Sequence, residues 1–149
     1  MKVDYCTFEY DDNWFGEITI KDDNTEKNID VEIVGGDDSN IPEDGKQALE
    51  FFLDNYKKYK EVLLEKIVDY YDLLKVNWGP DEERFPDLKE SKDIYEMITL
   101  IGIRIRDQER YGKYSIALYF DCTWDMEEGM GIDMTEFKVT KLGVQGEAF

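Results

Sequence analysis

The sequence has no histidine, two cysteines and three prolines among its 149 residues. Without histidine, the chain cannot build a Ser-His-Asp or Cys-His nucleophilic triad from its own residues. Its cysteines, Cys6 and Cys122, match no zinc-binding spacing, because a structural zinc site needs a full tetrahedral set of Cys and His ligands. We therefore expect two reduced, buried thiols and no bound metal or cofactor.

Bases are scarce as well: 18 lysines and arginines stand against 36 acids, which gives a formal net charge of −18. This imbalance opposes binding to nucleic acid and to anionic membranes. It favours a basic partner or a cation, or else it serves solubility alone. The N-terminus lacks the apolar segment of a signal peptide, and the longest strongly apolar run, 97–103, is far shorter than the ~20 residues that span a bilayer. We expect a soluble, cytoplasmic protein.

Motifs for catalysis are also missing. Gly129-Met130-Gly131 is too short for a dinucleotide fingerprint. Carboxylates are so abundant that chance pairs are expected, so no acid–base pair for glycoside cleavage stands out. The densest acidic stretch lacks the alternation of an EF-hand loop, which favours a solvated turn over a calcium site. Its acids are Asp121, Asp125, Glu127, Glu128 and Asp133. No residue is predicted to be catalytic.

Hydrophobic residues make up 42% of the chain and aromatic residues 14%, which is too rich for a disordered protein. A chain of this length buries roughly 68–70% of its unfolded surface, so a real core is expected. The sequence shows no internal repeat, low-complexity segment or linker. It therefore predicts a single domain over 1–149.

The first third of the chain has the loose alternation of β-strands at 5–10, 14–20 and 29–33. Short polar turns at 11–13 and 22–24 separate these segments. The pattern predicts a three-stranded β-meander.

The middle of the chain has helical periodicity from Ala48 onward. Ser39 or Asn40 is the expected N-cap, ahead of Pro42. The apolar stripe repeats at seven-residue spacing through Leu49, Tyr56, Leu63 and Tyr70. A pattern of about 30 residues exceeds the usual length of one globular helix. We expect a central helical pair broken near Asp54-Asn55, with one long helix as the alternative.

The last third predicts antiparallel strands after a loop at 77–91. Its most apolar run, 114–124, is expected to form a central strand buried on both faces. An acidic turn at 125–129 should follow it. The other strands are expected at 101–106, 131–135 and 137–142, with a hairpin loop at 107–112. Strands, then helices, then strands indicate an α+β domain whose helices pack on one face of a mostly antiparallel sheet.

The segment from Leu118 to Ile132 resembles the C-terminal motif of an uncharacterised bacterial domain family, approximately G-L-x-F-x-C-x-W-D-x-E-H-G-L-G-V. The Trp14-x-Gly16 element and the mid-chain helices resemble the same family's layout. Glu128 stands where that family usually has histidine, which suits a surface turn better than a catalytic site. The residues that the motif assigns to structure are Trp14, Gly16, Phe120, Cys122, Trp124, Gly129 and Gly131.

The resemblance also implies a function, because members of this and neighbouring families are often encoded near polymorphic toxin systems and have been proposed as immunity proteins. We therefore expect a non-enzymatic acidic binding protein that covers a basic toxin domain; the alternative is a small-molecule or cation-binding domain. Trp78 and Phe85 are either tucked against the core or exposed as anchors. The candidate contact residues are Trp78, Asp81, Glu82, Glu83, Phe85, Glu127 and Glu128.

Overall fold

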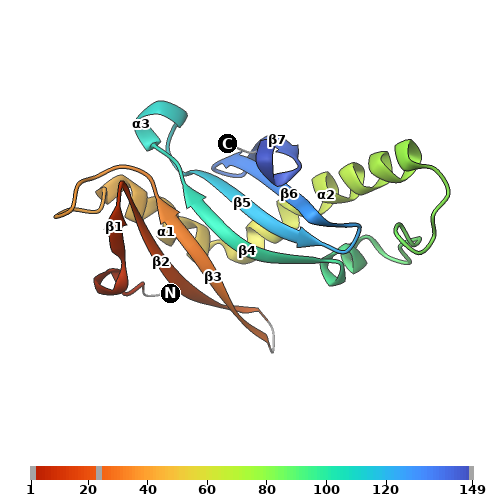
Figure 1. Ribbon diagram of the computed structural model, residues 1–149, viewed down its shortest axis with the longest axis horizontal. Helices are drawn as coiled ribbons and strands as arrows, with labels where there is room; N and C mark the ends of the chain where they lie inside the picture. Colours follow the sequence, from red (N-terminus) through yellow and green to blue (C-terminus); the bar gives the residue numbers. More distant parts are fainter. Residues whose placement is uncertain (1–2, 23–24, 148–149) are drawn as a thin grey trace.

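The computed structural model describes residues 3–22 and 25–147, which form a seven-stranded sheet backed by two helices. Figure 1 shows α1 (Glu43–Asp54) and α2 (Tyr56–Trp78) lying against one face of the sheet. The strands follow chain order across the sheet: β1 (Glu9–Asp11), β2 (Asn13–Asp22), β3 (Thr25–Ile33), β4 (Ile98–Ile105), β5 (Ser115–Cys122), β6 (Asp125–Thr135) and β7 (Lys138–Gly143). The predicted α+β architecture is confirmed.

All neighbouring strands pair antiparallel except β3 and β4, which run parallel. A parallel pair needs a long crossover connection, and here α1, α2 and the 3-10 helix η2 (Ser91–Glu96) form that connection. In the chain, the two helices therefore connect β3 to β4, which are distant in sequence and adjacent in the sheet.

The predicted N-terminal meander is present as β1, β2 and β3, but the predicted strand at 5–10 is wrong in its first half. Tyr5–Thr7 forms a 3-10 helix, η1, in which the Asp4 carboxylate accepts a hydrogen bond from the Cys6 backbone N–H at 3.1 Å. This local cap competes with strand pairing, so pairing begins only at Glu9. The predicted turn at 22–24 lies largely outside the described residues.

The predicted break in the central helix is confirmed at Asn55. Asn55 leaves helical geometry, with φ −114° and ψ 21°, and both its backbone N–H, at 3.1 Å, and its side-chain amide, at 2.8 Å, donate to the carbonyl of Phe51. The expected N-cap is wrong, because Pro42 stands at that position. Ser39 and Asn40 instead donate their backbone N–H groups to the Asp37 carboxylate, each at 2.9 Å.

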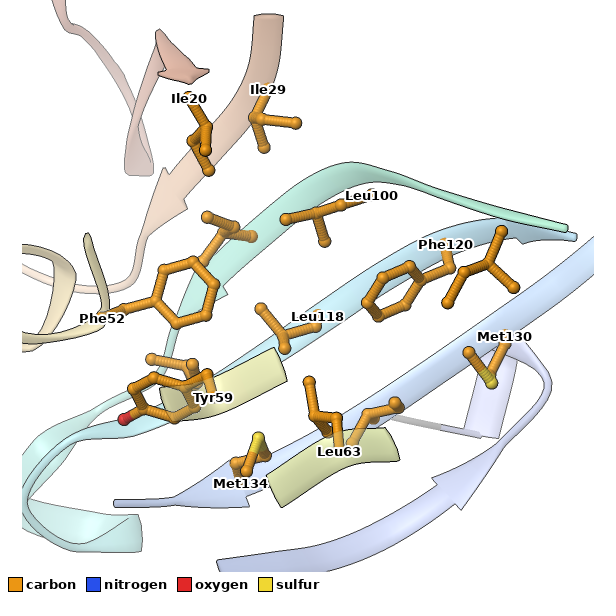
Figure 2. Close-up of a cluster of buried hydrophobic side chains, with 14 of the residues drawn as sticks. Ile20, Ile29, Phe52, Tyr59, Leu63, Leu100, Leu118, Phe120, Met130 and Met134 are labelled. Atoms are coloured by element: carbon orange, nitrogen blue, oxygen red, sulfur yellow. The ribbon is translucent and has the colours of Figure 1, made fainter. Parts of the chain in front are cut away.

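Strand β5 lies at the centre of the core, and the predicted burial on both faces is found only in its first half, because Tyr119 is half-buried and Asp121 is exposed. Figure 2 shows Phe52 and Tyr59 from the helices lying close to Leu118. Leu118 and Phe120 share the parity that faces the helices, while Ala117 points to the other face of the sheet. We call that other face, which α1 and α2 do not cover, the open face.

The predicted acidic turn at 125–129 is wrong, because the chain turns at Thr123-Trp124 and β6 begins at Asp125. A register irregularity between Phe120 and Cys122 accommodates the acids within the strand. Gly129 makes this possible: its φ is +58°, and a Cβ there would lie 2.3 Å from the Phe120 carbonyl oxygen. The predicted hairpin loop at 107–112 contains a one-turn helix, α3 (Gln108–Tyr111).

The two cysteines differ, and the prediction that both are buried is wrong for Cys6, which is exposed. Cys122 is buried, and burial, aided by the Asp125 and Asp121 carboxylates, raises the pKa of its thiol to about 12. Because the thiolate is the reactive form, only Cys6 should react with an aromatic disulfide reagent in the folded protein at mildly alkaline pH. Denaturant should expose the second thiol. Labelling of folded Cys6→Ser at the wild-type rate would contradict this assignment.

Candidate functional site

An acidic groove lies at the end of the molecule where α2 stops. It is a hollow of about 670 Å³ between the loop after α2 and the turn joining β5 to β6. We define the acidic groove by its lining residues Asp81, Glu83, Arg84, Thr123, Trp124, Asp125, Met126 and Glu127. Two segments about 40 residues apart in sequence therefore contribute to one surface.

Arg84 holds the two sides of the acidic groove together. Its guanidinium Nη1 donates to the backbone carbonyl of Trp124 at 3.0 Å. The same guanidinium lies 4.2 Å from the centre of the Trp78 ring, within the range of a cation–π contact. The Asp81 carboxylate accepts from the Arg84 backbone N–H at 3.0 Å and so fixes the loop that carries this arginine.

The two aromatic residues proposed as anchors occupy different environments. Phe85 is only 3% exposed and lies 5.6 Å from the Tyr71 ring, so it belongs to the core and cannot contact a partner. Trp78 is 59% exposed at the end of α2, and Met126 is 72% exposed on the other side of the groove. The exposed large apolar side chains at the groove are therefore Met126 in its lining and Trp78 beside Arg84, whereas Phe85 is buried.

The charge at the groove is strongly negative. Arg84 is the base in its lining, and its own guanidinium is engaged by the Trp124 carbonyl and the Trp78 ring. The acids in the lining, or adjacent in sequence to it, are Asp81, Glu82, Glu83, Asp125, Glu127 and Glu128. Of these, Asp125 also accepts from the Glu128 backbone N–H at 3.1 Å, which shapes the start of β6.

The carboxylates of the acidic stretch that was considered as a calcium site do not come together at one point. Asp133 lies far along β6 from Asp125 and is paired with Arg106, at 3.4 Å between Oδ2 and Nη1. Within residues 3–22 and 25–147, no three metal-ligating side chains gather closely enough to hold an ion. The same described residues include no helix with the length and hydropathy needed to cross a membrane.

The motif residues assigned to structure lie where packing requires them. Trp14 donates its indole N–H to the Asn40 carbonyl at 3.1 Å and so ties β2 to the segment ahead of α1. Gly16 lies under Phe8, whose ring a Cβ would approach to 2.4 Å. The motif residues buried in or beside β5 and β6 are Phe120, Cys122, Trp124, Gly129 and Gly131.

Sequence analysis missed a second polar cluster, on the open face. Arg104 pairs with Glu32 at 3.2 Å, and Arg106 pairs with Asp133 while stacking 3.6 Å from the centre of the Tyr111 ring. The alternation of arginines with isoleucines in 101–106 carried the signal, since it directs both guanidinium groups to one face. Asp133 is 4% exposed, and its Oδ1 has no hydrogen-bond partner among the described residues.

Burial raises the pKa of Asp133, and the opposing charges of Arg106, Lys141 and Arg104 do not cancel this effect. The folded state then holds this proton more tightly than the unfolded state, so Asp133 lowers stability as pH rises through the carboxyl range. The free energy of unfolding of Asp133→Asn, minus that of the wild type, is therefore expected to be larger at about pH 7 than at about pH 4. Urea unfolding at both pH values measures this change, with the exposed Asp121→Asn as control. An equal stability difference at both pH values would refute it.

The fold and the groove define an α+β protein with one open sheet, two helices on one face, and a strongly acidic recess at one end. Over residues 4–149 the chain matches the family described as Domain of unknown function (DUF6985), and it belongs to that family. The predicted membership of an uncharacterised domain family is thereby confirmed. No curated protein and no solved structure matches the chain.

Proposed function

We propose that the protein is a non-enzymatic binding protein of the immunity type, which covers a basic toxin domain with its acidic groove. The observation that carries this proposal is the joining of two acidic segments around a recess, with Met126 exposed in its lining and Trp78 exposed next to its Arg84. Interfaces are typically anchored by a few large side chains within a polar rim. Trp78 suits such an anchor because its ring is rigid, exposed and backed by Arg84.

The charge of the groove favours a basic partner. Six acids around one recess, on a chain of net charge −18, produce a negative field that reaches about 8–10 Å in physiological salt. Such a field attracts a basic surface and repels nucleic acid or another acidic protein. A toxin that acts on nucleic acid needs a basic active-site surface, so a nuclease domain would match the acidic groove in charge.

Co-purification with the product of the neighbouring gene, as the candidate toxin, tests the proposal. We expect the full-length protein to retain that product and to inhibit its activity at equimolar ratio. The groove variant Asp81→Asn, Glu82→Gln, Glu83→Gln should lose most of this retention. Its matched control is Glu9→Gln, Asp11→Asn, Asp12→Asn, which removes the same charge at the β1 end of the molecule (Figure 1). Equal retention by both variants would mean that the groove is not the contact surface.

A further inference from the structure

A small, partly enclosed cavity lies in the core between the helices and the sheet, and it shares no lining residue with the acidic groove. Its volume is about 40 Å³. Side chains from α1, α2, β4 and β5 form its apolar wall, and Figure 2 shows several of them: Phe52, Leu63, Leu100, Leu118 and Phe120. The apolar side chains of this wall make up half of the lining, so an aliphatic group suits the part of the cavity that they enclose.

The cavity opens toward solvent at an ion pair between α2 and the end of β2. Lys60 donates to the Asp22 carboxylate at 2.7 Å, and both side chains are about three-quarters buried. The ammonium lies 4.8 Å from the centre of the Tyr95 ring, and the Tyr95 hydroxyl donates to the Lys60 backbone carbonyl. Burial, together with Asp22, raises the pKa of Tyr56 to about 12, so this second tyrosine at the mouth keeps its hydroxyl proton. Polar donors thus ring the entrance to an apolar interior.

Outside this mouth lies a second, open hollow of about 540 Å³ that shares Asp22, Tyr56, Lys60 and Tyr95 with the cavity. The charge around the two hollows differs from that of the whole chain. Acids outnumber bases by 36 to 18 overall. Here the bases are Lys21, Lys27, Lys57 and Lys60, and the acids are Asp22, Asp54 and Glu61. Because Lys21 is also paired with Glu26 at 3.4 Å, bases and acids balance here, so the two hollows repel an anionic group less than the rest of this acidic surface does.

Volume limits what can enter the cavity. Its 40 Å³ is roughly a quarter of the ~150 Å³ in which an apolar protein cavity binds benzene. A ring is therefore too large, whereas the end of an unbranched alkyl chain fits. The remainder of such a chain would lie in the outer hollow. Lys60 carries three N–H donors, one of which goes to Asp22, so it can also bind an anionic head group.

We propose that this site binds a small amphiphile with a carboxylate head and an unbranched aliphatic chain. The chain end fills the cavity beside Leu118 and Phe120, and the carboxylate lies in the outer hollow against the Lys60 ammonium. The proposal does not depend on the immunity function, because none of the cavity's lining residues lines the acidic groove.

Octanoate is the probe, titrated into the full-length protein in a calorimeter and in thermal melts at fixed ionic strength. We expect saturable binding at millimolar concentration or below and a matching rise in Tm. Acetate, which has the head group alone, and octylammonium, which has the opposite charge, should give neither. Lys60→Met keeps the apolar stem and should weaken octanoate binding about tenfold or more. Lys57→Met, which changes a lysine of the outer hollow only, should weaken it much less.

A second variant tests the cavity itself. Leu118→Phe adds volume to the cavity wall and should abolish octanoate binding while leaving the protein folded by circular dichroism. If that variant does not fold, the octanoate titration of Lys60→Met still tests the proposed site. No octanoate binding to the wild type, equal binding of octylammonium, or unchanged binding by Lys60→Met would each overturn the proposal and leave the cavity as a packing void.

Discussion

Replacing Trp124 with alanine is expected to lower the free energy of unfolding by about 3–5 kcal/mol. The indole is 3% exposed, packs edge-on against the Tyr71 ring at 5.2 Å, and closes the core beneath the β5–β6 turn. Its removal leaves a cavity that α2 cannot collapse to fill, because Tyr71 is itself fully packed. Urea unfolding monitored by circular dichroism measures the loss.

Met126→Ala is the matched control, since Met126 lies two residues further along the chain, near the start of β6, and is 72% exposed. We expect it to change stability by no more than about 0.5 kcal/mol. A loss below about 1 kcal/mol for Trp124→Ala would show that the indole is not part of the core. The acidic groove would then lack the rigid floor that positions Arg84.

Association with a basic partner is expected to slow roughly tenfold or more as salt rises from about 50 mM to about 500 mM. The reason is that salt screens the field of the groove acids before contact, while short-range contacts persist after it. Neutralising Asp81, Glu82 and Glu83 together should lower the association rate at low salt and flatten its salt dependence. The dissociation rate should change less.

Trp78→Ala should have the opposite kinetic signature, raising the dissociation rate roughly tenfold or more with little change in association. Its indole would be buried only in the complex, so its loss acts after the encounter. Surface plasmon resonance at two salt concentrations separates the two effects. Association and dissociation rates that do not change with salt concentration would mean that the acidity serves solubility alone.

Much of the fold was predictable because its signals are local. The alternation of Ile29, Val31 and Ile33 with polar residues marks β3, and the stripe through Leu49 and Leu63 marks the helices. The break at Asn55 followed from length, and in the structure this residue departs from helical geometry, with φ −114° and ψ 21°. The parallel pairing of β3 with β4 could not be predicted from strand patterns, because it depends on where the helical crossover returns the chain.

The wrong secondary-structure predictions fall on residues whose usual conformational preferences are overridden by their neighbours. Asp125 to Glu128 suggested a turn by composition, yet they continue a strand because Gly129 permits a positive φ beside Phe120. Asp4 caps a 3-10 helix that an alternation pattern could not reveal. The Arg106–Asp133 pair on the open face joins the residue that follows β4 to β6, a strand that does not neighbour β4 in the sheet.

The candidate site was predicted only in pieces. The acids at 81–83 and at 127–128 stood out by charge, but nothing in the sequence placed them around one recess. That placement comes from the hydrogen bond of Arg84 to the Trp124 carbonyl, a contact across 40 positions. Phe85 could not be distinguished from Trp78 by composition. The loop turns it inward against Tyr71, while the end of α2 leaves Trp78 in solvent.

Amide hydrogen exchange of the protein with and without its basic partner tests the central claim most directly. The claim is that the acidic groove is the contact surface. It predicts added protection in two segments, 78–84 and 123–128, and unchanged exchange at the β1 end around 9–13. Protection confined to other segments, with neither side of the acidic groove affected, would contradict the claim.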